Sequence, residues 1–383
     1  MLNKNYCIGV IGAGTMGSGI VQLASSFGHK VLLFDSNAAV VTQAFERINK
    51  SLEALVQKGK ITDASAKNTL SNITNAKSIN EFAKCDLVIE AVIEELSVKL
   101  EIFKKLEQIV SKDCVLATNT SSLSVTSIAA ACNGSGRVVG IHFFNPATIM
   151  PLVEIIPGIA TDARVVEESR ALINSWNKVT VLAKDTPGFI VNRVARSFYG
   201  EAIRIYEEGI ADFATIDWAM KEIGGFKMGP FELMDFIGND VNFKVTETVW
   251  TQMFFDNRYR PSLTQKRLYE AGFWGRKKGR GYYNYANGAV MPEPNKNEAL
   301  GNEIFLRIIS MLINEAYDAL YHHVASREDL ELAMTKGVNY PKGLIQWGHE
   351  IGLEKILNKL LQLHSMYLED RYRPSVLITV QDK

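Results

Sequence analysis

Short apolar runs alternate with amphipathic stretches through the first half of the chain. The run Cys7–Ile11 precedes a stretch with helical periodicity that reaches about Phe27, and Lys30–Phe34 is again apolar. Apolar runs of this length, bounded by turn residues, are typical of buried strands. Further strands are predicted at 86–92, 115–118, 138–143, 152–156 and 178–183, with a helix over 97–110. This alternation predicts a parallel, doubly wound α/β sheet with helices on both faces.

The segment of about 37–80 departs from this alternation. It is longer than the usual connection between two parallel strands, which is often little more than one helix. Its apolar residues follow helical spacing on both sides of Lys58-Gly59-Lys60. We therefore expect a pair of helices, inserted after the second strand, with these three residues at the turn between them.

From Asp185 onward the pattern is mainly helical, because a proline and a glycine end the last predicted strand. An internal repeat follows: residues 200–220 align with 314–334, and NRYRPS at 257–262 recurs as DRYRPS at 370–375. The polar segment between the copies is rich in proline and asparagine. We predict a first domain over 1–184, an all-α region with two copies of a helical domain over 185–290 and 303–383, and a linker over 291–302.

Composition and charge exclude several classes of function. The chain has 383 residues, of which 47% are hydrophobic and 22% charged, an ordinary composition for a globular protein of more than one domain. Its 42 basic residues equal its 42 acidic residues, so no overall field favours nucleic acid or a membrane. No apolar run is long enough to span a bilayer, and the N-terminus leaves no room for a signal peptide. The four cysteines show neither metal-ligand nor disulfide-framework spacing, so we expect free thiols, no metal and a cytoplasmic location.

The first predicted strand runs into a glycine-rich turn. Gly12 permits the tight turn, Gly14 lets the backbone approach a pyrophosphate, and Gly17 allows the next helix to pack closely on the strand. The helix N-terminus, with Thr15 and Met16 in its first turn, offers N–H donors and a partial positive charge to phosphates. The turn therefore predicts a dinucleotide site.

An acid ends the second predicted strand. Asp35 lies 18 residues beyond Gly17, and a carboxylate there can accept hydrogen bonds from both ribose hydroxyls and would repel a 2′-phosphate. The alternative for Asp35 is a cap of the following helix or turn. Strand, glycine turn, helix and acid together predict a Rossmann-type domain that binds NAD in preference to NADP.

Two polar residues stand in runs that are otherwise strongly apolar. His142 lies within VVGIHFFNP, and Glu154 lies at the centre of LVEII, twelve residues further on. Either would be costly to bury unpaired, although His142 alone could be a core histidine bonded to a backbone carbonyl. If the two strands are neighbours, Glu154 accepts a hydrogen bond from one ring nitrogen, and the other can act as a base. Such a pair suits oxidation of a secondary alcohol, in which the histidine takes the hydroxyl proton while the hydride moves to NAD.

Long motifs identify a family that the chain resembles. They are VIGAGTMGSGI, DLVIEAVIEELSVK, TNTSSLSVTSIA, GIHFFNPATIMPLVEII, KDTPGFIVNR, MGPFELMDFIG and GRKKGRGYYNY. With them the chain closely resembles the L-3-hydroxyacyl-CoA dehydrogenases, and among these the 3-hydroxybutyryl-CoA dehydrogenases, over about its first 285 residues. The resemblance implies an NAD-dependent enzyme that interconverts an L-3-hydroxyacyl-CoA and its 3-oxoacyl-CoA, with a short acyl chain, as in the β-oxidation of fatty acids.

The resemblance also implies roles for individual residues. It makes His142 the catalytic base and Glu154 its partner. It makes Ser121 and Asn192 hydrogen-bonding partners of the substrate 3-oxygen and the histidine region, although by position alone they could be turn and cap residues.

Other family positions concern the cofactor and the substrate. Glu94, Lys99 and Asn119 match residues that line the NAD site, although Lys99 could instead pair with Glu95 at helical spacing. The inserted helical pair normally helps to hold the CoA of the substrate. The candidates for its phosphates are Lys58 and Lys60, which could otherwise form a solvated turn.

Other functions remain open at this stage. A related dehydrogenase could act on 3-hydroxyadipyl-CoA or on a free 3-hydroxy acid, and a catalytically silent NAD-binding structural protein could share the fold. The basic run at 275–280 could suggest nucleic acid, but its glycines and the aromatic residues after it match a family loop. We therefore expect no nucleic-acid partner.

The second helical copy is degenerate. Leu306 takes the place of Asn192, whereas Arg193 aligns with Arg307. This copy also has no nucleotide domain of its own, so we predict a structural role for it. Because single-copy relatives dimerise through this domain, we expect the two copies to form a pseudo-dimer within one chain, in a protein that is a monomer or a homodimer.

Overall fold

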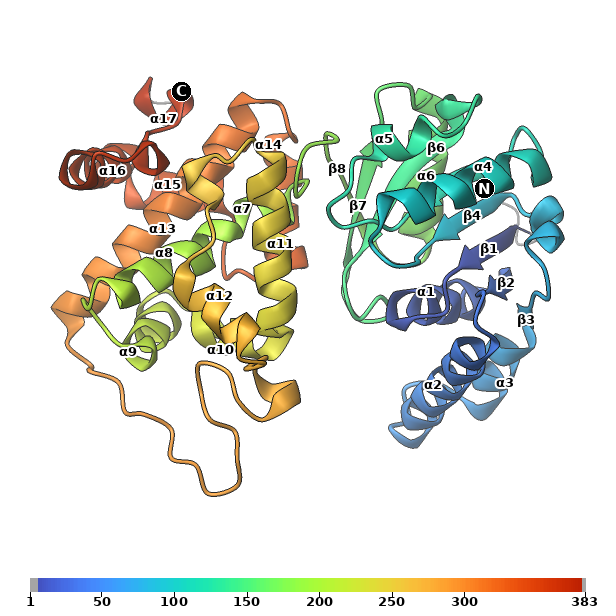
Figure 1. The fold of residues 1–383 in the computed structure, drawn as a ribbon, viewed down its shortest axis with the longest axis horizontal. Helices are drawn as coiled ribbons and strands as arrows, with labels where there is room; N and C mark the ends of the chain where they lie inside the picture. The colour runs from blue at the N-terminus through green and yellow to red at the C-terminus, as the bar shows by residue number, and fades with distance from the viewer. Residues whose placement is uncertain (1–5, 381–383) are drawn as a thin grey trace. The chain divides into compact units, whose positions relative to one another are not determined.

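The structure is a computed structural model that describes residues 6–380 and divides into two compact units (Figure 1). The first unit ends at Thr186 and the second begins at Pro187, whereas the sequence places the boundary after residue 184. The first unit is the predicted α/β domain, and the second is helical.

An eight-stranded sheet forms the centre of the first unit, in the order β3-β2-β1-β4-β5-β6-β7-β8. The order of its first six strands is that of a dinucleotide-binding domain. The strands are β1 (Cys7–Ile11), β2 (Lys30–Phe34), β3 (Ile73–Asn75), β4 (Leu87–Glu90), β5 (Val115–Thr118), β6 (Val138–Phe143), β7 (Leu152–Pro157) and β8 (Val179–Leu182). The predicted strands are confirmed, and β3 is an additional short strand at the edge of the sheet.

The prediction of a wholly parallel sheet is wrong at one pair of strands. β7 runs antiparallel to β6, while β8 runs parallel to β7. The reason is the short loop 144–151 between β6 and β7, because a parallel crossover needs a dozen residues or more. The antiparallel pairing places His142 directly opposite Glu154.

Helices cover both faces of the sheet. One face packs against α1 (Thr15–Ser26), α2 (Ala38–Gln57), α3 (Asp63–Ser71) and α6 (Ala163–Ser175). The other packs against α4 (Leu96–Ile109), α5 (Val125–Ala129) and the 3₁₀ turn Ile79–Lys84. The helices α2 and α3 are the predicted inserted pair, and Gly59 at their turn has a φ of +65°, in the left-handed region that favours glycine.

The helical unit consists of two series of elements. The first series is α7 (Val191–Val194), α8 (Arg196–Glu207), α9 (Phe213–Trp218), a π-helical turn (Ala219–Ile223), α10 (Pro230–Ile237), α11 (Asn239–Gln252), a 3₁₀ turn (Asn257–Tyr259), α12 (Leu263–Glu270) and a 3₁₀ turn (Arg276–Lys278). The second is α13 (Glu298–Tyr321), α14 (Arg327–Leu332), a π-helical turn (Ala333–Gly337), α15 (Leu344–Ile351), α16 (Leu353–Tyr367), a 3₁₀ turn (Asp370–Tyr372) and α17 (Val376–Thr379). Helix α13 begins inside the segment predicted as linker.

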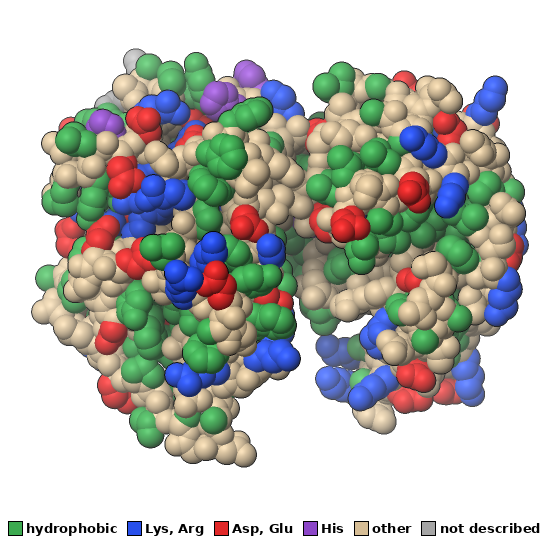
Figure 2. All heavy atoms as spheres, in the orientation of Figure 1, with side chains coloured by type: hydrophobic (Ala, Val, Ile, Leu, Met, Phe, Trp, Pro, Cys, Tyr) green, Lys and Arg blue, Asp and Glu red, His purple; other side chains and the backbone are tan. Residues whose placement is uncertain are grey.

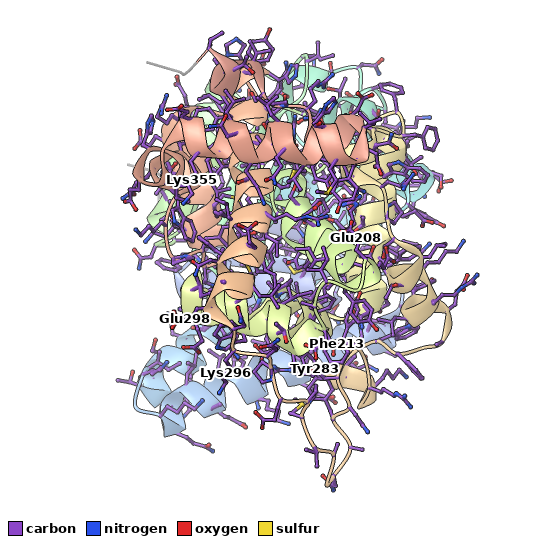
Figure 3. The ribbon with its side chains drawn as sticks, turned by 90° about the vertical axis from the view of Figure 1, so that its left-hand side faces the viewer. Glu208, Phe213, Tyr283, Lys296, Glu298 and Lys355 are labelled. Atoms are coloured by element: carbon purple, nitrogen blue, oxygen red, sulfur yellow. The ribbon has the colours of Figure 1, made fainter. Side chains whose placement is uncertain are left out.

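Helix α13 is the centre of this unit. Most of its residues from Ile304 to Ala319 are buried on all sides, as expected for a helix surrounded by others. It packs against α8, α15 and α16, and α16 crosses it (Figure 3). Within residues 6–380, no helix combines the length and the apolar character that a membrane span requires.

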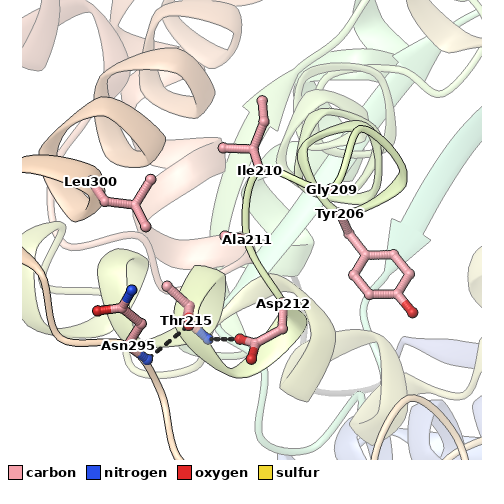
Figure 4. A pocket seen from close by; sticks show the side chains of 8 residues that line it. All are labelled: Tyr206, Gly209, Ile210, Ala211, Asp212, Thr215, Asn295 and Leu300. Atoms are coloured by element: carbon pink, nitrogen blue, oxygen red, sulfur yellow. Dashed lines mark hydrogen bonds between the residues drawn. The ribbon is translucent and has the colours of Figure 1, made fainter.

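A hollow of about 420 Å³ lies where the segment before α13 meets the first series of helices (Figure 4). The Asn295 backbone N–H donates to Thr215 Oγ1 over 2.9 Å, and the Thr215 N–H in turn donates to the capping carboxylate of Asp212 over 2.8 Å. These bonds tie the connecting segment to the start of α9.

Candidate active site

The glycine-rich turn has the geometry that a dinucleotide requires. A Cβ at Gly12, whose φ is +98°, would lie 2.4 Å from a backbone oxygen of Ala91, and a Cβ at Gly17 would lie 1.8 Å from that of Gly12. By contrast, nothing lies within 4 Å of a Cβ built on Gly14, so the backbone there is open to a ligand. Helix α1 begins immediately after Gly14 without a side-chain cap on its N-terminus. The turn therefore fits a pyrophosphate on the first N–H groups of α1.

Asp35 lies beside this turn. Its Oδ2 accepts from the Ala13 N–H over 2.8 Å, and its Oδ1 accepts from the Asn37 N–H over 2.9 Å. The side chain of Arg47 on α2 donates to the Ala13 carbonyl over 2.6 Å. Sequence reasoning missed Arg47, because its part in the turn depends on the docking of the inserted helices. The carboxylate is held at the end of β2, where the ribose of a bound dinucleotide is expected.

Replacing Asp35 by alanine should therefore weaken the preference for NADH over NADPH. The loss of charged hydrogen-bond acceptors and of the repulsion against a 2′-phosphate should lower the ratio of kcat/KM values by about 10–100-fold. The measurement is steady-state kinetics with each cofactor, with Asp113→Ala on an exposed turn as the control. An unchanged cofactor ratio in Asp35→Ala would contradict the assignment.

Glu94 organises the turn that follows β5. Its Oε1 accepts from the Thr120 hydroxyl over 2.6 Å, the Ser121 N–H over 2.9 Å and the Ser122 hydroxyl over 3.1 Å. Burial acts to raise the pKa of Glu94, but the Lys99 charge and these hydrogen bonds outweigh it, so that the pKa is lowered. An ionised Glu94 therefore holds the backbone of Ser121 in place at the carboxyl end of the sheet.

Lys99 lies beneath this turn. Its side chain is 1% exposed, and its Nζ lies 2.7 Å from Glu90 and 3.2 Å from Glu94. The predicted alternative of a pair with Glu95 is not what the structure has. Glu90, which the sequence reasoning missed, also accepts from the Thr118 hydroxyl over 2.7 Å. Lys99 thus links a carboxylate at the end of β4 with one in the segment that follows β4, and direct contact of Lys99 with NAD stays a prediction.

His142 and Glu154 make the contact that the sequence predicts. The His142 Nδ1 lies 2.7 Å from the Glu154 Oε2, the histidine is 5% exposed, and the glutamate is fully buried. A carboxylate beside Nδ1 favours the tautomer that carries its hydrogen on Nδ1 and its lone pair on Nε2. The Phe144 ring, whose centroid lies 4.5 Å from that of the imidazole, covers part of it. The arrangement is a buried imidazole oriented by a buried carboxylate.

The end of β5 is joined to the histidine strand. The Asn119 Oδ1 accepts from the Phe143 N–H over 2.9 Å, and the Asn119 N–H donates to the Glu90 carbonyl over 2.8 Å. Asn119 therefore bonds the backbone next to His142, and its contact with NAD stays a prediction. The turn with Ser121 and the end of the strand with His142 both lie at the carboxyl ends of the strands, where ligands of such domains bind.

The remaining predicted site residues lie in two other places. Asn192 lies on α7 in the helical unit, half-buried, and its backbone carbonyl accepts from Arg196 over 2.9 Å. Lys58 and Lys60 are exposed at the turn of the inserted helical pair. Basic side chains gather on this pair in the space-filling view (Figure 2). The roles of these three residues stay predictions.

Comparison with known proteins identifies the family. The profile of the 3-hydroxyacyl-CoA dehydrogenase NAD binding domain matches residues 7–186, and that of the 3-hydroxyacyl-CoA dehydrogenase C-terminal domain matches residues 188–285 and 304–381. The chain belongs to the 3-hydroxyacyl-CoA dehydrogenase family. It is therefore an NAD-dependent oxidoreductase of this family, as the resemblance of its motifs implies.

Several relatives match most of the chain. A 3-hydroxyadipyl-CoA dehydrogenase from Escherichia coli (strain K12) is 37% identical, over 99% of this chain and 98% of its own length. A 3-hydroxybutyryl-CoA dehydrogenase from Bradyrhizobium diazoefficiens is 39% identical, over 74% of this chain and 97% of its own. The crystal structure of a 3-hydroxybutyryl-CoA dehydrogenase from Escherichia coli K12 substr. MG1655 has a TM-score of 0.92 and 36% identity, and the match covers 99% of this chain and 98% of that one.

Proposed function

We propose that this family member oxidises a short-chain L-3-hydroxyacyl-CoA, such as 3-hydroxybutyryl-CoA, or reduces the corresponding 3-oxoacyl-CoA, with His142 as the general base. The observation that carries the proposal is the 2.7 Å contact of His142 with the buried Glu154 at the carboxyl end of a dinucleotide-binding sheet. Bound NAD supplies the hydride acceptor. The protein supplies the base, its orientation and a dry surrounding.

His142 manages the proton of the reaction. Its Nε2 accepts the proton of the substrate 3-hydroxyl as the carbinol carbon loses its hydride, and the imidazolium returns the proton in the reverse direction. The Glu154 carboxylate stabilises the imidazolium and keeps the ring in the tautomer that leaves Nε2 basic. Burial strengthens this interaction, because fewer water molecules screen the two charges.

Two further residues are proposed to bind the substrate oxygen. Ser121 lies on a turn whose backbone is held by Glu94. Its side chain therefore starts from a fixed position at the carboxyl ends of the strands, the same end of the sheet where His142 lies. Asn192 follows the Pro187-Gly188 pair, and its amide can both donate and accept. Glu94, Lys99 and Asn119 complete the proposed cofactor site.

The inserted helical pair is proposed to hold the CoA phosphates. Lys58 and Lys60 flank Gly59 at the exposed turn between α2 and α3, where the ammonium groups face water and can meet a diphosphate. Such exposed contacts add modest affinity and are weakened by salt. This proposal applies to the acyl-CoA substrate and not to NAD.

A second candidate substrate is 3-hydroxyadipyl-CoA. It is favoured by the relative of that name, which matches nearly the whole chain, whereas the solved structure with the same coverage carries the 3-hydroxybutyryl-CoA name. The test is kcat/KM with NADH on acetoacetyl-CoA, 3-oxoadipyl-CoA, longer 3-oxoacyl-CoAs and free acetoacetate. We expect acetoacetyl-CoA to be the best substrate and the free acid to be inert. A higher kcat/KM for 3-oxoadipyl-CoA than for acetoacetyl-CoA would contradict this expectation and favour 3-hydroxyadipyl-CoA as the substrate.

We also propose that the helical unit is a duplicated domain whose copies form a pseudo-dimer. The order of elements supports this, since the π-helical turn Ala219–Ile223 has its counterpart at Ala333–Gly337, and α10 (Pro230–Ile237) at α15 (Leu344–Ile351). In both cases the shift along the chain is 114 residues. The match of the C-terminal domain profile to two segments of the chain agrees with this reading.

Reciprocal contacts between the copies give the strongest support. Arg193 Nε donates to Glu315 over 2.6 Å, and Tyr259 donates to the same carboxylate oxygen over 2.5 Å. In the aligned positions, Arg307 Nε donates to Glu201 Oε1 over 2.6 Å, and Tyr372 donates to that oxygen over 2.8 Å. Contacts that run from one copy to the other and are repeated in reverse are the mark of a two-fold symmetric interface.

The two clusters also differ. Arg307 has a second acid, Glu208 at the end of α8 (Figure 3), 2.7 Å away, and Arg193 has Asp318 at 2.9 Å. In the alignment the counterpart of Asp318 is Arg204, so the copies are no longer interchangeable. This asymmetry suits a contact made within one chain.

Removing either buried acid should destabilise the helical unit. Glu201→Gln and Glu315→Gln each remove one of the two acids that face a buried arginine and leave the other, Glu208 or Asp318. We therefore expect each substitution to lower the free energy of unfolding by about 1–3 kcal/mol. Chemical denaturation measures this, and Glu298→Gln, on an exposed first turn of α13, is the control with a change below about 0.5 kcal/mol. Wild-type stability in either buried variant would contradict the paired arrangement.

A cytoplasmic location also stays a proposal. Its support is that Cys7, Cys85, Cys114 and Cys132 are all free thiols in the structure, as in proteins of reducing compartments.

A further inference from the structure

The loop 144–151 joins the two strands that carry the proposed catalytic pair. It leaves β6 two residues after His142 and enters β7 two residues before Glu154. Lys178, immediately before β8, reaches into this loop: its Nζ donates to the Ala147 carbonyl over 2.6 Å and to the Met150 carbonyl over 2.7 Å. One side chain thus bridges two points of the loop.

The Lys178 ammonium is buried at a cost. The residue is 7% exposed, and burial lowers the pKa of Lys178 to about 8. The hydrogen-bond acceptors that the loop offers are neutral carbonyl oxygens, which compensate a buried charge less than a carboxylate does. A methionine of similar length would fill the space without this cost. What the lysine adds is the pair of hydrogen bonds to the loop.

Apart from one polar pair, the side chains of β6 and β7 specify the register of these strands weakly. Alternation of apolar and polar residues normally fixes which residues of two strands are opposite, because a slip would turn apolar side chains to water. In β6 every residue except His142 is apolar, and in β7 every residue except Glu154 is apolar. A slip by one residue would place His142 opposite Val153 or Ile155 and leave both polar groups buried without each other. The polar pair is thus the strands' own preference for the observed register, and the loop adds a second constraint to it.

The loop is anchored to rigid elements on two sides. A Cβ on Gly19 of α1 would lie 3.2 Å from the Ala147 Cβ, so the loop packs closely on the helix of the dinucleotide turn. On the other side the Val179 N–H donates to the Pro151 carbonyl over 2.8 Å, where β7 and β8 begin to pair. Lys178 connects these two anchors, because it is next to Val179 in the chain and bonds Ala147.

We propose that Lys178 is a positioning residue of the active site: by holding the loop 144–151 it sets the register of β6 against β7, and so the contact of His142 with Glu154. Lys178 acts through this pair and touches neither substrate nor cofactor. The inference rests on the proposed function of the pair.

A double-mutant cycle tests the proposal. Lys178→Met should lower kcat by about 10-fold or more in the wild-type background, but only by about twofold or less in a Glu154→Gln background, where the pair is already impaired. The acid limb of the pH–rate profile for 3-hydroxybutyryl-CoA oxidation should move in Lys178→Met, as it does in Glu154→Gln. NADH affinity, measured by fluorescence titration, should stay close to wild type in every variant.

Matched variants separate the possible failures. Lys112→Met, at an exposed turn, removes a lysine without touching the loop and should leave kcat and the pH profile unchanged. If Lys178→Met does not fold, Lys178→Arg replaces it, because a planar guanidinium cannot reproduce both short bonds and the resulting loss should again depend on Glu154. Independent, additive losses, or full activity without the lysine, would overturn the role of Lys178. Full activity of Glu154→Gln alone would instead overturn the proposed function of the pair.

Discussion

Turnover should fall by about 10²–10⁴-fold when His142 is replaced by glutamine, while NADH affinity stays within about twofold of wild type. Glutamine fills a similar space and keeps hydrogen-bonding groups, but it cannot take up a proton at neutral pH. The glycine-rich turn and Asp35 are separate from the histidine along the chain and hold their own contacts. The measurements are kcat for acetoacetyl-CoA reduction and the dissociation constant of NADH.

The control for this variant is His323→Gln, at an exposed position after α13 in the helical unit. It should leave both quantities unchanged. Near-normal turnover in His142→Gln would end the assignment of the base. Loss of NADH binding together with turnover would show that His142 supports the fold of the cofactor site and not the proton transfer.

Glu154→Gln is expected to lower turnover by about 10²–10⁴-fold and to change its pH dependence. The neutral amide no longer stabilises the imidazolium, and its NH₂ group can present a donor to Nδ1 and favour the wrong tautomer. Removing the negative charge beside the ring disfavours the protonated form of the imidazole relative to the neutral one. The acid limb of the rate profile for 3-hydroxybutyryl-CoA oxidation should therefore move toward lower pH.

The measurement is the pH dependence of kcat/KM for oxidation in wild type and in Glu154→Gln. Glu167→Gln, exposed on α6, is the control that removes a carboxylate from the same unit without touching the pair. A profile that lies on the wild-type curve after Glu154→Gln would remove the proposed role of the glutamate.

Most of the sheet could be predicted from the sequence because its strands are buried on both faces. Such strands appear as continuous apolar runs, and the bounds of β1, β2, β5 and β6 agree with the prediction. β3 was not predicted, because Ile73–Asn75 has only one apolar residue and forms the outermost strand of the sheet. The antiparallel direction of β7 relative to β6 could have been inferred from the loop between them, since eight residues are too few for a parallel crossover.

The candidate site was predictable where polarity broke an apolar pattern. His142 and Glu154 are conspicuous within their strands, and one pairing removes the cost of burying both. Glu90, which was not predicted, carried the same signal, because it stands within the apolar run LVIEAVI. Arg47 and Lys178 carried no such signal. They donate to backbone carbonyls of other elements, and those contacts exist only after the helices and loops have docked.

The proposed duplication has its sequence signal in the repeated segments. NRYRPS and DRYRPS both contain a tyrosine, Tyr259 or Tyr372, that donates to a glutamate of the other half of the helical unit. The reciprocity of these contacts could not be predicted, since an alignment says which residues correspond and not which ones meet.

Single-turnover formation of NADH is the most direct test of the central claim that this site oxidises a 3-hydroxyacyl-CoA. The wild-type protein with bound NAD is mixed with L-3-hydroxybutyryl-CoA at alkaline pH, and NADH is followed by its absorbance. We predict a rapid formation of NADH that His142→Gln slows by about 10²–10⁴-fold, and no reaction with free 3-hydroxybutyrate. Tight binding of NAD without NADH formation from any 3-hydroxyacyl-CoA would contradict the account.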